Sequence, residues 1–183
     1  ATAVDAFGRL DILVNNAGIC PRISIEDMTA DSYDRIMNTN LRSVFFLSRE
    51  AGNAMKASGK GRIINVSSTG GRTGGIFNAT VYSASKAGIM SMTKAFARHF
   101  APNNILVNCI APGYFATEMN TTLVEDDAFN AWVVGRTPVG RWGRPEEVAS
   151  ATLFLCAPAA SYITGTILFV DGGWTAHHGR FTP

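Results

Sequence analysis

The chain has 183 residues, of which 46% are hydrophobic, and a formal net charge of +2 from 16 basic and 14 acidic residues. This length suits one domain with a sizeable core, and the hydrophobic fraction excludes a disordered chain. The charges are balanced and evenly spread, so we expect neither a nucleic acid nor an anionic membrane surface as a partner.

The sequence shows no clear pattern for a membrane span, a secretory signal or a metal site. No apolar run approaches the length of a bilayer span, and the first residues have neither the basic nor the apolar region of a secretory signal. The three cysteines are scattered, which favours a reducing compartment, so we expect a cytoplasmic protein. The histidines His99, His177 and His178 lack metal-ligand spacing, so we expect them to be structural or exposed and expect no metal site.

The sequence opens with "ATAVDAFG", which has the pattern of the end of a helix without a cap before it, and its first residue is not Met. We therefore expect the sequence to be the later part of a longer chain. Four short runs rich in Ile, Leu and Val follow along the sequence, bounded by turn signals. They are residues 10–14, 62–66, 105–110 and 166–170. Apolar runs without polar alternation are typical of strands buried on both faces of a parallel sheet.

Long helical patterns separate these runs. The first covers residues 31–57, with Thr29 or Asp31 as candidate N-cap, and the second covers residues 80–100 and stops before Pro102. The third, residues 144–157, has a proline and two glutamates in its first turn. This alternation predicts an α/β protein with a doubly wound, Rossmann-like parallel sheet, helices on both faces, and residues 1–183 in a single domain.

Small and polar clusters follow each predicted strand, where open parallel sheets bind their ligands. They are "NNAG" (15–18), "SSTGG" (67–71), "APGYFAT" (111–117) and "DGGW" (171–174). We expect all four clusters to line one edge of the sheet.

The stretch "STGGRTGGIFNATVYSASK" (68–86) combines clustered glycines with a tyrosine and a lysine. Its glycines do not match the spacing of a dinucleotide fingerprint, which favours a flexible turn over a phosphate site. Tyr82 and Lys86 are four residues apart and share a helix face, so an ammonium near the phenol is expected to lower its pKa toward neutral pH. Ser68 is placed to polarise a carbonyl, and Asn40 to fix a water beside Lys86.

Several motifs occur together and in a characteristic order: "NNAG", "NTNL", "NVSS", "YSASK", "NCIAPGYFATEM" and "VDGG". In this combination the chain resembles the short-chain dehydrogenase/reductase family over essentially its whole length. The resemblance implies an NAD(P)-dependent oxidoreductase with an Asn–Ser–Tyr–Lys tetrad, here Asn40, Ser68, Tyr82 and Lys86.

In the roles that the resemblance implies, Tyr82 exchanges a proton with the substrate oxygen and Ser68 orients the carbonyl. Lys86 lowers the tyrosine pKa and binds the nicotinamide ribose, while Asn40 holds a proton-relay water. The resemblance also implies binding of NAD or NADP by a larger set of residues. That set is Asn15, Ala17, Gly18, Tyr82, Lys86, Pro112, Gly113, Phe115 and Thr117. The alternative for "NNAG" is a strand-end turn that only steadies the sheet.

The Gly-rich fingerprint that the family places after its first strand is not in this sequence. We therefore expect the C-terminal, catalytic part of such a domain, without its first strands. The residue that separates NAD from NADP is missing with them.

Residues 113–147, here called the lid segment, resemble the gluconate 5-dehydrogenase type of sugar-acid and polyol dehydrogenase through "LVEDDAFNAW" and "RTPVGRWG". Arg72, Arg136 and Arg141 are candidates for pairing with a substrate carboxylate, although each is also explained as a solvated charge.

The resemblance also suggests an oligomer. Ile89, Met92, Phe96 and Phe100 form one stripe on the second helix, which is either core or a face that pairs across a two-fold axis. We expect a homodimer or homotetramer, with "TILFVDGGW" at a second interface.

Three functions are compatible with these motifs. The leading one is interconversion of a secondary alcohol and a ketone on a small hydroxy compound, such as a sugar acid or polyol. Reduction of a 3-oxoacyl thioester is the alternative enzymatic function, because the same tetrad can catalyse both reactions. A non-catalytic binding or assembly fragment is the alternative of another class.

Overall fold

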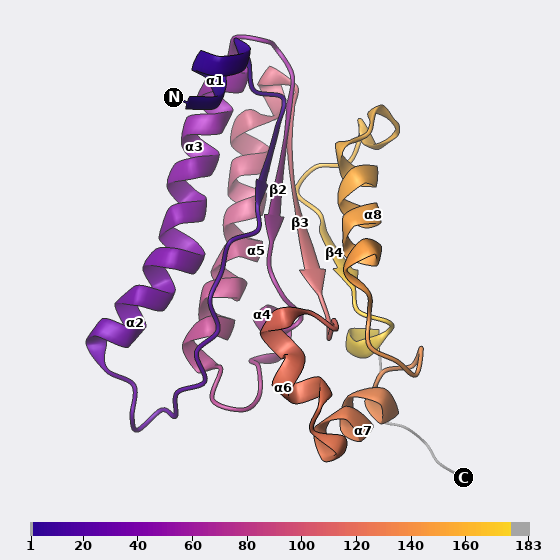
Figure 1. Cartoon of the computed structure of the whole chain (residues 1–183). Coiled ribbons are helices and arrows are strands. Elements are labelled where there is room, and N and C mark those ends of the chain that lie inside the picture. Colours follow the sequence, from indigo (N-terminus) through magenta and orange to yellow (C-terminus); the bar gives the residue numbers. More distant parts are fainter. Residues whose placement is uncertain (1, 177–183) are drawn as a thin grey trace.

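Four parallel strands form one sheet in the order β1-β2-β3-β4 in the computed structural model, which describes residues 2–176 (Figure 1). The strands are β1 (Ile12–Asn15), β2 (Gly61–Val66), β3 (Ile105–Pro112) and β4 (Ile167–Val170). All four predicted strands are confirmed, with ends shifted by no more than two residues.

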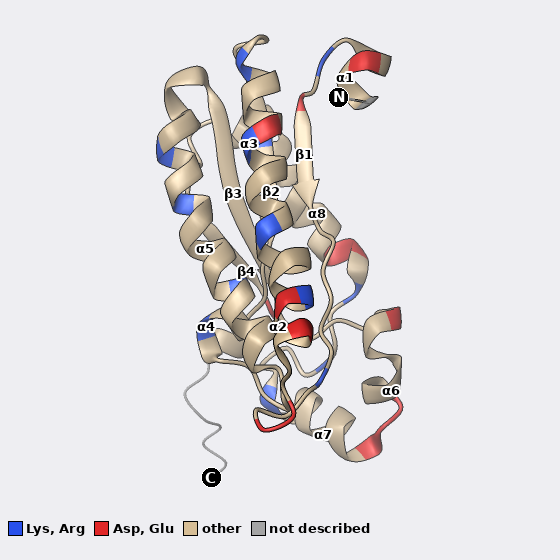
Figure 2. Cartoon of the chain, turned by 90° about the vertical axis from the view of Figure 1, so that its left-hand side faces the viewer, with Lys and Arg blue, Asp and Glu red and all other residues tan. Residues whose placement is uncertain are grey.

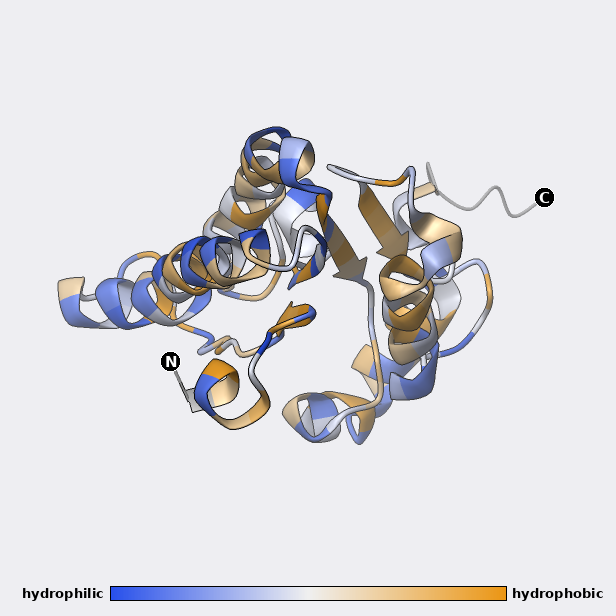
Figure 3. Ribbon diagram, turned by 90° about the horizontal axis from the view of Figure 1, so that it is seen from above, coloured by the Kyte–Doolittle hydropathy of each residue, from blue (hydrophilic) through white to orange (hydrophobic). Residues whose placement is uncertain are grey.

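Helices cover both faces of this sheet, as the α/β prediction requires (Figures 1 and 3). α3 and α5 pack on one face, while α8 contacts β2, β3 and β4 on the other. The helices are α1 (Thr2–Phe7), α2 (Ala30–Met37), α3 (Ser43–Lys56), α4 (Gly70–Thr73), α5 (Thr80–Phe100), α6 (Thr121–Val124), α7 (Asp127–Arg136) and α8 (Pro145–Cys156). α4, α6 and α7 gather at the end of the sheet to which the strands point (Figure 1).

β1 departs from the prediction that each strand is buried on both faces. Leu13 packs against the core under α3 and α5, and Asn15 is buried. Ile12 and Val14, which point the other way because side chains alternate along a strand, are 46% and 43% exposed. The apolar sequence of β1 is therefore covered on one face only among the described residues.

The predicted helix over residues 31–57 forms as α2, a π-helical turn at Asn38–Arg42, and α3. Thr29 is the N-cap, because its Oγ1 accepts a hydrogen bond of 3.1 Å from Ser32 N. π-Helical turns are rare and recur at functional sites. This one contains Asn40, the residue that the sequence placed in the catalytic tetrad.

The ends of α5 and α8 follow the predicted signals. α5 stops at Phe100, before a 3₁₀ turn at Ala101–Asn103 that contains Pro102. Pro145 is the first residue of α8, and the Glu147 carboxylate accepts a hydrogen bond of 2.7 Å from Arg144 N. The Pro-Glu-Glu pattern thus marks a helix start with a capping carboxylate.

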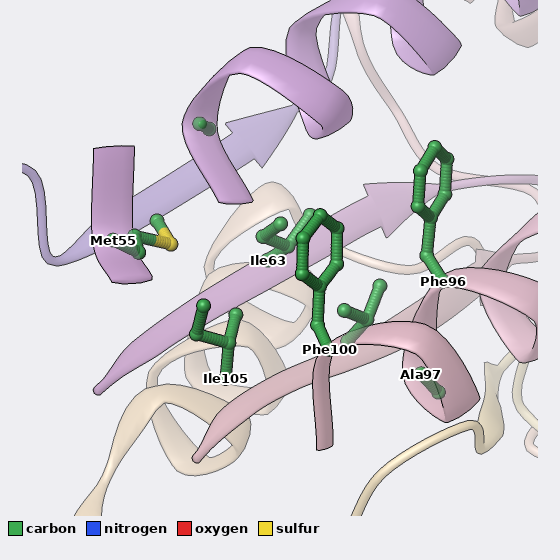
Figure 4. Packing of buried hydrophobic residues seen from close by; sticks show 8 residues of the cluster. Met55, Ile63, Phe96, Ala97, Phe100 and Ile105 are labelled. Atoms are coloured by element: carbon green, nitrogen blue, oxygen red, sulfur yellow. The ribbon is translucent and has the colours of Figure 1, made fainter. Parts of the chain in front are cut away.

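The main core lies between the sheet and the α3–α5 layer (Figure 4). Its buried members are Ala51, Met55, Ile63, Phe96, Ala97, Phe100, Ile105 and Val107. Gly52 lets the two helices approach closely, because a Cβ at that position would collide with the ring of Phe100. Ile89, Phe96 and Phe100 are buried, so the apolar stripe of α5 faces the core. This agrees with the core interpretation of the stripe given above.

Lys and Arg are scattered among Asp and Glu over α2 and α3, whereas α5 carries Lys and Arg without Asp or Glu (Figure 2). Within residues 2–176, no helix combines the length and the apolar character needed to cross a membrane. Over the same range, no three His, Cys, Asp or Glu side chains gather in a group able to hold a metal ion. His99 is exposed, with its ring against Phe100 at 4.7 Å, and His177 and His178 lie outside the described residues.

Candidate active site

The loop after β2 and the first turns of α5 are tied together at the edge of the sheet. Lys86 Nζ donates a hydrogen bond of 2.8 Å to the Val66 carbonyl at the end of β2. The Ser67 hydroxyl donates one of 2.7 Å to the Lys86 carbonyl. These two bonds hold the loop that carries Ser68 against the helix that carries Tyr82, and the Ser68 side chain is close enough to the phenol to lower its pKa.

Lys86 and Tyr82 lie on one face of α5, as their spacing predicted, with Nζ 5.6 Å from the centre of the phenol ring. Burial lowers the pKa of the Lys86 ammonium to about 8. Burial also raises the pKa of Tyr82, an effect that the Ser68 hydrogen bond only partly offsets. The prediction of a lowered tyrosine pKa is therefore wrong for this structure, because burial outweighs the favourable partners of the phenolate.

Asn40 is fully buried, and its side-chain amide forms hydrogen bonds with both the N–H and the carbonyl group of Ile19. Its Nδ2 donates to Ile19 O at 2.9 Å and its Oδ1 accepts from Ile19 N at 2.8 Å. A third bond, from Nδ2 to Ser85 Oγ at 3.2 Å, connects it to α5. Asn40 therefore holds the segment after "NNAG" against the helix that carries Tyr82 and Lys86.

Gly18 lies where Asn40 and Lys86 come together. A Cβ at this position would lie 3.3 Å from Lys86 Nζ and 3.4 Å from Asn40 Oδ1, which is tighter than ordinary packing. The glycine therefore leaves open the space in front of both polar groups. The prediction that Asn40 holds a relay water stays a prediction.

Two cavities meet at Ser68 and Tyr82. The first, here called the rim cavity, has a volume of about 360 Å³ and follows the carboxyl ends of the strands. Seven of the predicted cofactor-binding residues line it: Gly18, Tyr82, Lys86, Pro112, Gly113, Phe115 and Thr117. The predicted cofactor site thus forms one continuous wall with the tyrosine and the lysine.

The second, here called the lid cavity, has a volume of about 400 Å³ and lies under the lid segment. Tyr114, Trp132 and Trp174 give it aromatic walls, and Arg22 and Arg136 give it positive charge. No Asp or Glu occurs among its described lining residues. Burial raises the pKa of Tyr114 to about 12, against the lowering effect of both arginines, so this phenol is neutral.

The two asparagines of "NNAG" have different environments. Asn15, predicted to bind the cofactor, is buried and its Nδ2 donates to Ser48 Oγ at 2.9 Å and Asn65 Oδ1 at 2.8 Å. Asn16, which is not among the predicted cofactor-binding residues, lines the rim cavity. Neither Asn15 nor Ala17 is among the lining residues of that cavity. The alternative interpretation of Asn15, a residue that steadies the sheet, fits its contacts.

Of the three arginines considered for a carboxylate, only Arg136 lines the lid cavity. Arg141 forms a two-point ion pair with Glu147, at 2.7 and 3.0 Å, at the start of α8. Arg72 stacks over the ring of Phe169 at 5.4 Å. Arg22, which follows "NNAG" in an irregular segment and is not among the predicted arginines, lines the lid cavity beside Arg136.

The rim cavity fits the nicotinamide half of a dinucleotide. It has an ordinary ligand-pocket volume, a lysine ammonium to donate to ribose hydroxyls, and a wall kept open at Gly18. Gly113, another lining residue, lies close to Asp171, because a Cβ at Gly113 would come within 2.8 Å of the aspartate Cβ. The residues that would hold the cofactor are therefore Asn16, Gly18, Lys86, Gly113 and Thr117.

Comparisons with known proteins find similarity to oxidoreductases along nearly the whole chain. The family model described as enoyl-(acyl carrier protein) reductase matches residues 1–175. A tropinone reductase homolog of Arabidopsis thaliana is 44% identical over 176 residues, which cover 96% of this chain and 66% of the relative. The 2-dehydro-3-deoxy-D-gluconate 5-dehydrogenase of Escherichia coli (strain K12) is 42% identical over 175 residues, covering 95% of this chain and 69% of the relative.

A solved structure gives the same result in three dimensions. The gluconate 5-dehydrogenase of Burkholderia cenocepacia J2315, crystallised with NADP and tartrate, superposes with a TM-score of 0.92 at 38% sequence identity. The match covers 96% of this chain and 69% of that one. The chain thus spans about two thirds of the length of these relatives.

The buried ammonium of Lys86 leads to a pH prediction. Since burial disfavours the charged form, Lys86 should titrate near pH 8 in the folded protein, and near 10.4 when unfolded. The unfolded chain then binds more protons between these values, so this group makes stability rise with pH across that window. NMR of the lysine Cε resonances measures the titration directly.

The variant Lys86→Arg assigns the resonance, because the shifted signal should disappear from its spectrum. A midpoint near the model-peptide value for Lys86 in the folded protein would contradict the burial argument.

Proposed function

The chain belongs to the short-chain dehydrogenase/reductase family, and on this premise we propose that it interconverts a secondary alcohol and a ketone on a sugar acid with NAD or NADP. One observation carries the proposal: Ser68 and Tyr82 line both the rim cavity and the lid cavity. A substrate in the lid cavity and a nicotinamide in the rim cavity would meet at these two hydroxyl groups. Bound NAD or NADP supplies the hydride acceptor or donor.

The chain's own residues then position the substrate and move the proton. Tyr82 takes the proton from the alcohol or returns it to the ketone oxygen, and Ser68 hydrogen-bonds the same oxygen. Lys86 holds the ribose from the other cavity, and Asn40 fixes the segment that forms the wall beside it. The raised pKa of Tyr82 keeps its phenol protonated at neutral pH, so the hydroxyl group can donate a hydrogen bond to the ketone oxygen during reduction.

The lid cavity supports a sugar acid as the substrate class. Arg22 and Arg136 offer planar donors for a carboxylate, and aromatic rings suit the C–H faces of a hydroxylated chain. The relatives include a 2-dehydro-3-deoxy-D-gluconate 5-dehydrogenase, and the Burkholderia structure contains tartrate, itself a hydroxy acid. A carrier-bound 3-oxoacyl thioester would favour a basic docking surface, whereas the basic residues of α2 and α3 are interspersed with acidic ones (Figure 2).

The location and assembly of the protein are part of the same proposal. Cys20, Cys109 and Cys156 are all unpaired, which supports a reducing, cytoplasmic location. We place residues 1–183 in a single domain that pairs with a second copy. An open apolar groove between α3 and α5 supports such pairing, because Phe45 and Phe46 are 42% and 40% exposed beside it. Leu153 and Phe154, exposed on α8, support a second interface near β4.

The first prediction concerns the phenol. Tyr82→Phe removes only the hydroxyl that moves the proton, so turnover of sugar acids should fall by about 10²- to 10⁴-fold. Binding of NADPH, followed by fluorescence, should stay close to that of the parent protein. Tyr162→Phe is the matched control, since Tyr162 is fully exposed. Unchanged turnover in Tyr82→Phe would contradict the role given to Tyr82, whereas absence of turnover in the parent protein would support a non-catalytic binding role.

The second prediction concerns the carboxylate. Arg22→Ala and Arg136→Ala should each lower kcat/KM for sugar acids by roughly 10- to 100-fold, the value of a hydrogen bond to a charged group. The effect on neutral polyols should be small. Arg72→Ala is the matched control, because Arg72 is not among the lining residues of the lid cavity. Equal losses for acids and polyols would contradict carboxylate recognition.

The third prediction concerns assembly. Light scattering should give a dimer or tetramer for the parent protein, and Phe46→Glu should shift it to a smaller species by placing a charge in the apolar groove. A parent protein that is monomeric at micromolar concentration would refute the α3–α5 interface. Tyr33→Glu, on the exposed surface of α2, is the control for the added charge.

A further inference from the structure

The turn between α4 and α5 has an unusual backbone. Four of the five residues 74–78 have positive φ, at 87° for Gly74, 70° for Gly75, 51° for Phe77 and 60° for Asn78. Glycine adopts such angles freely, but a phenylalanine at φ 51° brings its Cβ against the backbone. Conformations of this kind persist only where surrounding contacts hold them, and they concentrate at functional sites.

The contacts that hold this turn come from across the lid cavity. The ring of Phe77 packs against Phe129 at 5.1 Å and against Trp132 at 5.9 Å, both on α7. The Asn78 carbonyl accepts a hydrogen bond of 3.2 Å from Ile23 N, one residue beyond Arg22. The turn therefore joins the lid helix to the segment that brings Arg22 to the cavity.

The Phe77 ring is not held by burial in the core, because Phe77 is 53% exposed. Among the described residues, the aromatic rings that contact Phe77 are both on α7, and Trp132 is a wall of the lid cavity. Phe129 and Trp132 also contact each other, at 5.4 Å, and both contact Tyr114 at 6.0 Å. Phe77 thus extends an aromatic cluster of the lid segment onto the loop that leads to Tyr82.

A buried hydroxyl group lies beneath the same turn. Ser83 is 4% exposed, and in the described part of the chain its Oγ has no hydrogen-bond partner. Gly75 lies directly against it, because a Cβ on Gly75 would collide with Ser83 Oγ. Buried hydroxyl groups normally have a partner, so this unpaired group adds to the free energy that the turn's contacts must offset.

We propose that Phe77 is a positioning residue that holds lid helix α7 over the lid cavity through its contacts with Phe129 and Trp132. The strained turn of residues 74–78 presents the ring at the angle that reaches α7. Loss of the ring frees α7 to open, and with it the wall that Trp132 forms. The proposal rests on the proposed function only for the identity of the ligand in the cavity. The ring contacts themselves belong to the chain alone.

Limited proteolysis tests the inference without any substrate. Trypsin cleaves after Arg136, at the end of α7, and the cleavage rate reports how often the helix opens. Phe77→Ala should be cleaved about tenfold faster than the parent protein, which is the loss expected for two aromatic contacts. Phe77→Tyr keeps the ring and should be cleaved at the parent rate. Tyr162→Ala controls for removing an exposed ring elsewhere.

A parent-like cleavage rate in Phe77→Ala would overturn the proposal. Faster cleavage in both Phe77→Ala and Phe77→Tyr would also overturn it, because the ring would then not be the cause. A thermal melt of each variant accompanies the assay, and cleavage that tracks a lowered Tm of the whole chain would assign the effect to global unfolding and overturn it as well.

Steady-state kinetics adds a readout in the active enzyme. Because Phe77 is not among the described lining residues of either cavity, Phe77→Ala should raise KM for the sugar acid several-fold, with kcat nearly unchanged. Equal falls of kcat and kcat/KM would contradict a positioning role. Absence of turnover in the parent protein would defeat the proposed function, and the proteolysis result would still decide the role of Phe77.

Discussion

The hydrogen bond from Lys86 Nζ to the Val66 carbonyl connects α5 to the carboxyl end of β2, and the rest of the site depends on it. Together with the bond from Ser67 Oγ to the Lys86 carbonyl, it fixes the helix relative to the sheet. Gly71 permits the fit, since a Cβ there would lie 2.8 Å from the Lys86 carbonyl carbon. This constraint brings Ser68, from a strand end, against Tyr82, from a helix. It also buries an ammonium group, which is why the pKa of Lys86 falls.

Two cavities follow from this arrangement, and each has its own chemistry. The rim cavity is lined by the strand ends of a parallel sheet, where glycines and small polar groups leave room for a flat ligand. The lid cavity is lined by a helical segment that carries aromatic rings and arginines. Because the two share Ser68 and Tyr82, hydride and proton transfer can occur at one point while recognition takes place on either side.

The sequence predicted the parts of the site that depend on local pattern. The strands, α5, and the positions of Ser68, Tyr82 and Lys86 follow from apolar runs and from spacing on one helix. Asn15 stays a prediction as a cofactor-binding residue: its side chain points toward α3, whereas the next residue, Asn16, lines the rim cavity. Arg22 lies in an irregular segment and Trp174 begins a short 3₁₀ turn, and in neither does a periodic pattern indicate which cavity the side chain enters. The pKa of Tyr82 depends on how deeply the phenol is buried, and burial cannot be predicted from the spacing between Tyr82 and Lys86.

The most direct test of this account is a crystal structure of the protein with NADP and a sugar acid. We predict that the oxygen at the reacting carbon lies within hydrogen-bond distance of both Ser68 Oγ and the Tyr82 hydroxyl. The nicotinamide should occupy the rim cavity and the carboxylate should lie between Arg22 and Arg136. A sugar acid bound away from Ser68 and Tyr82, or a nicotinamide in the lid cavity, would contradict the division of the site into these two cavities.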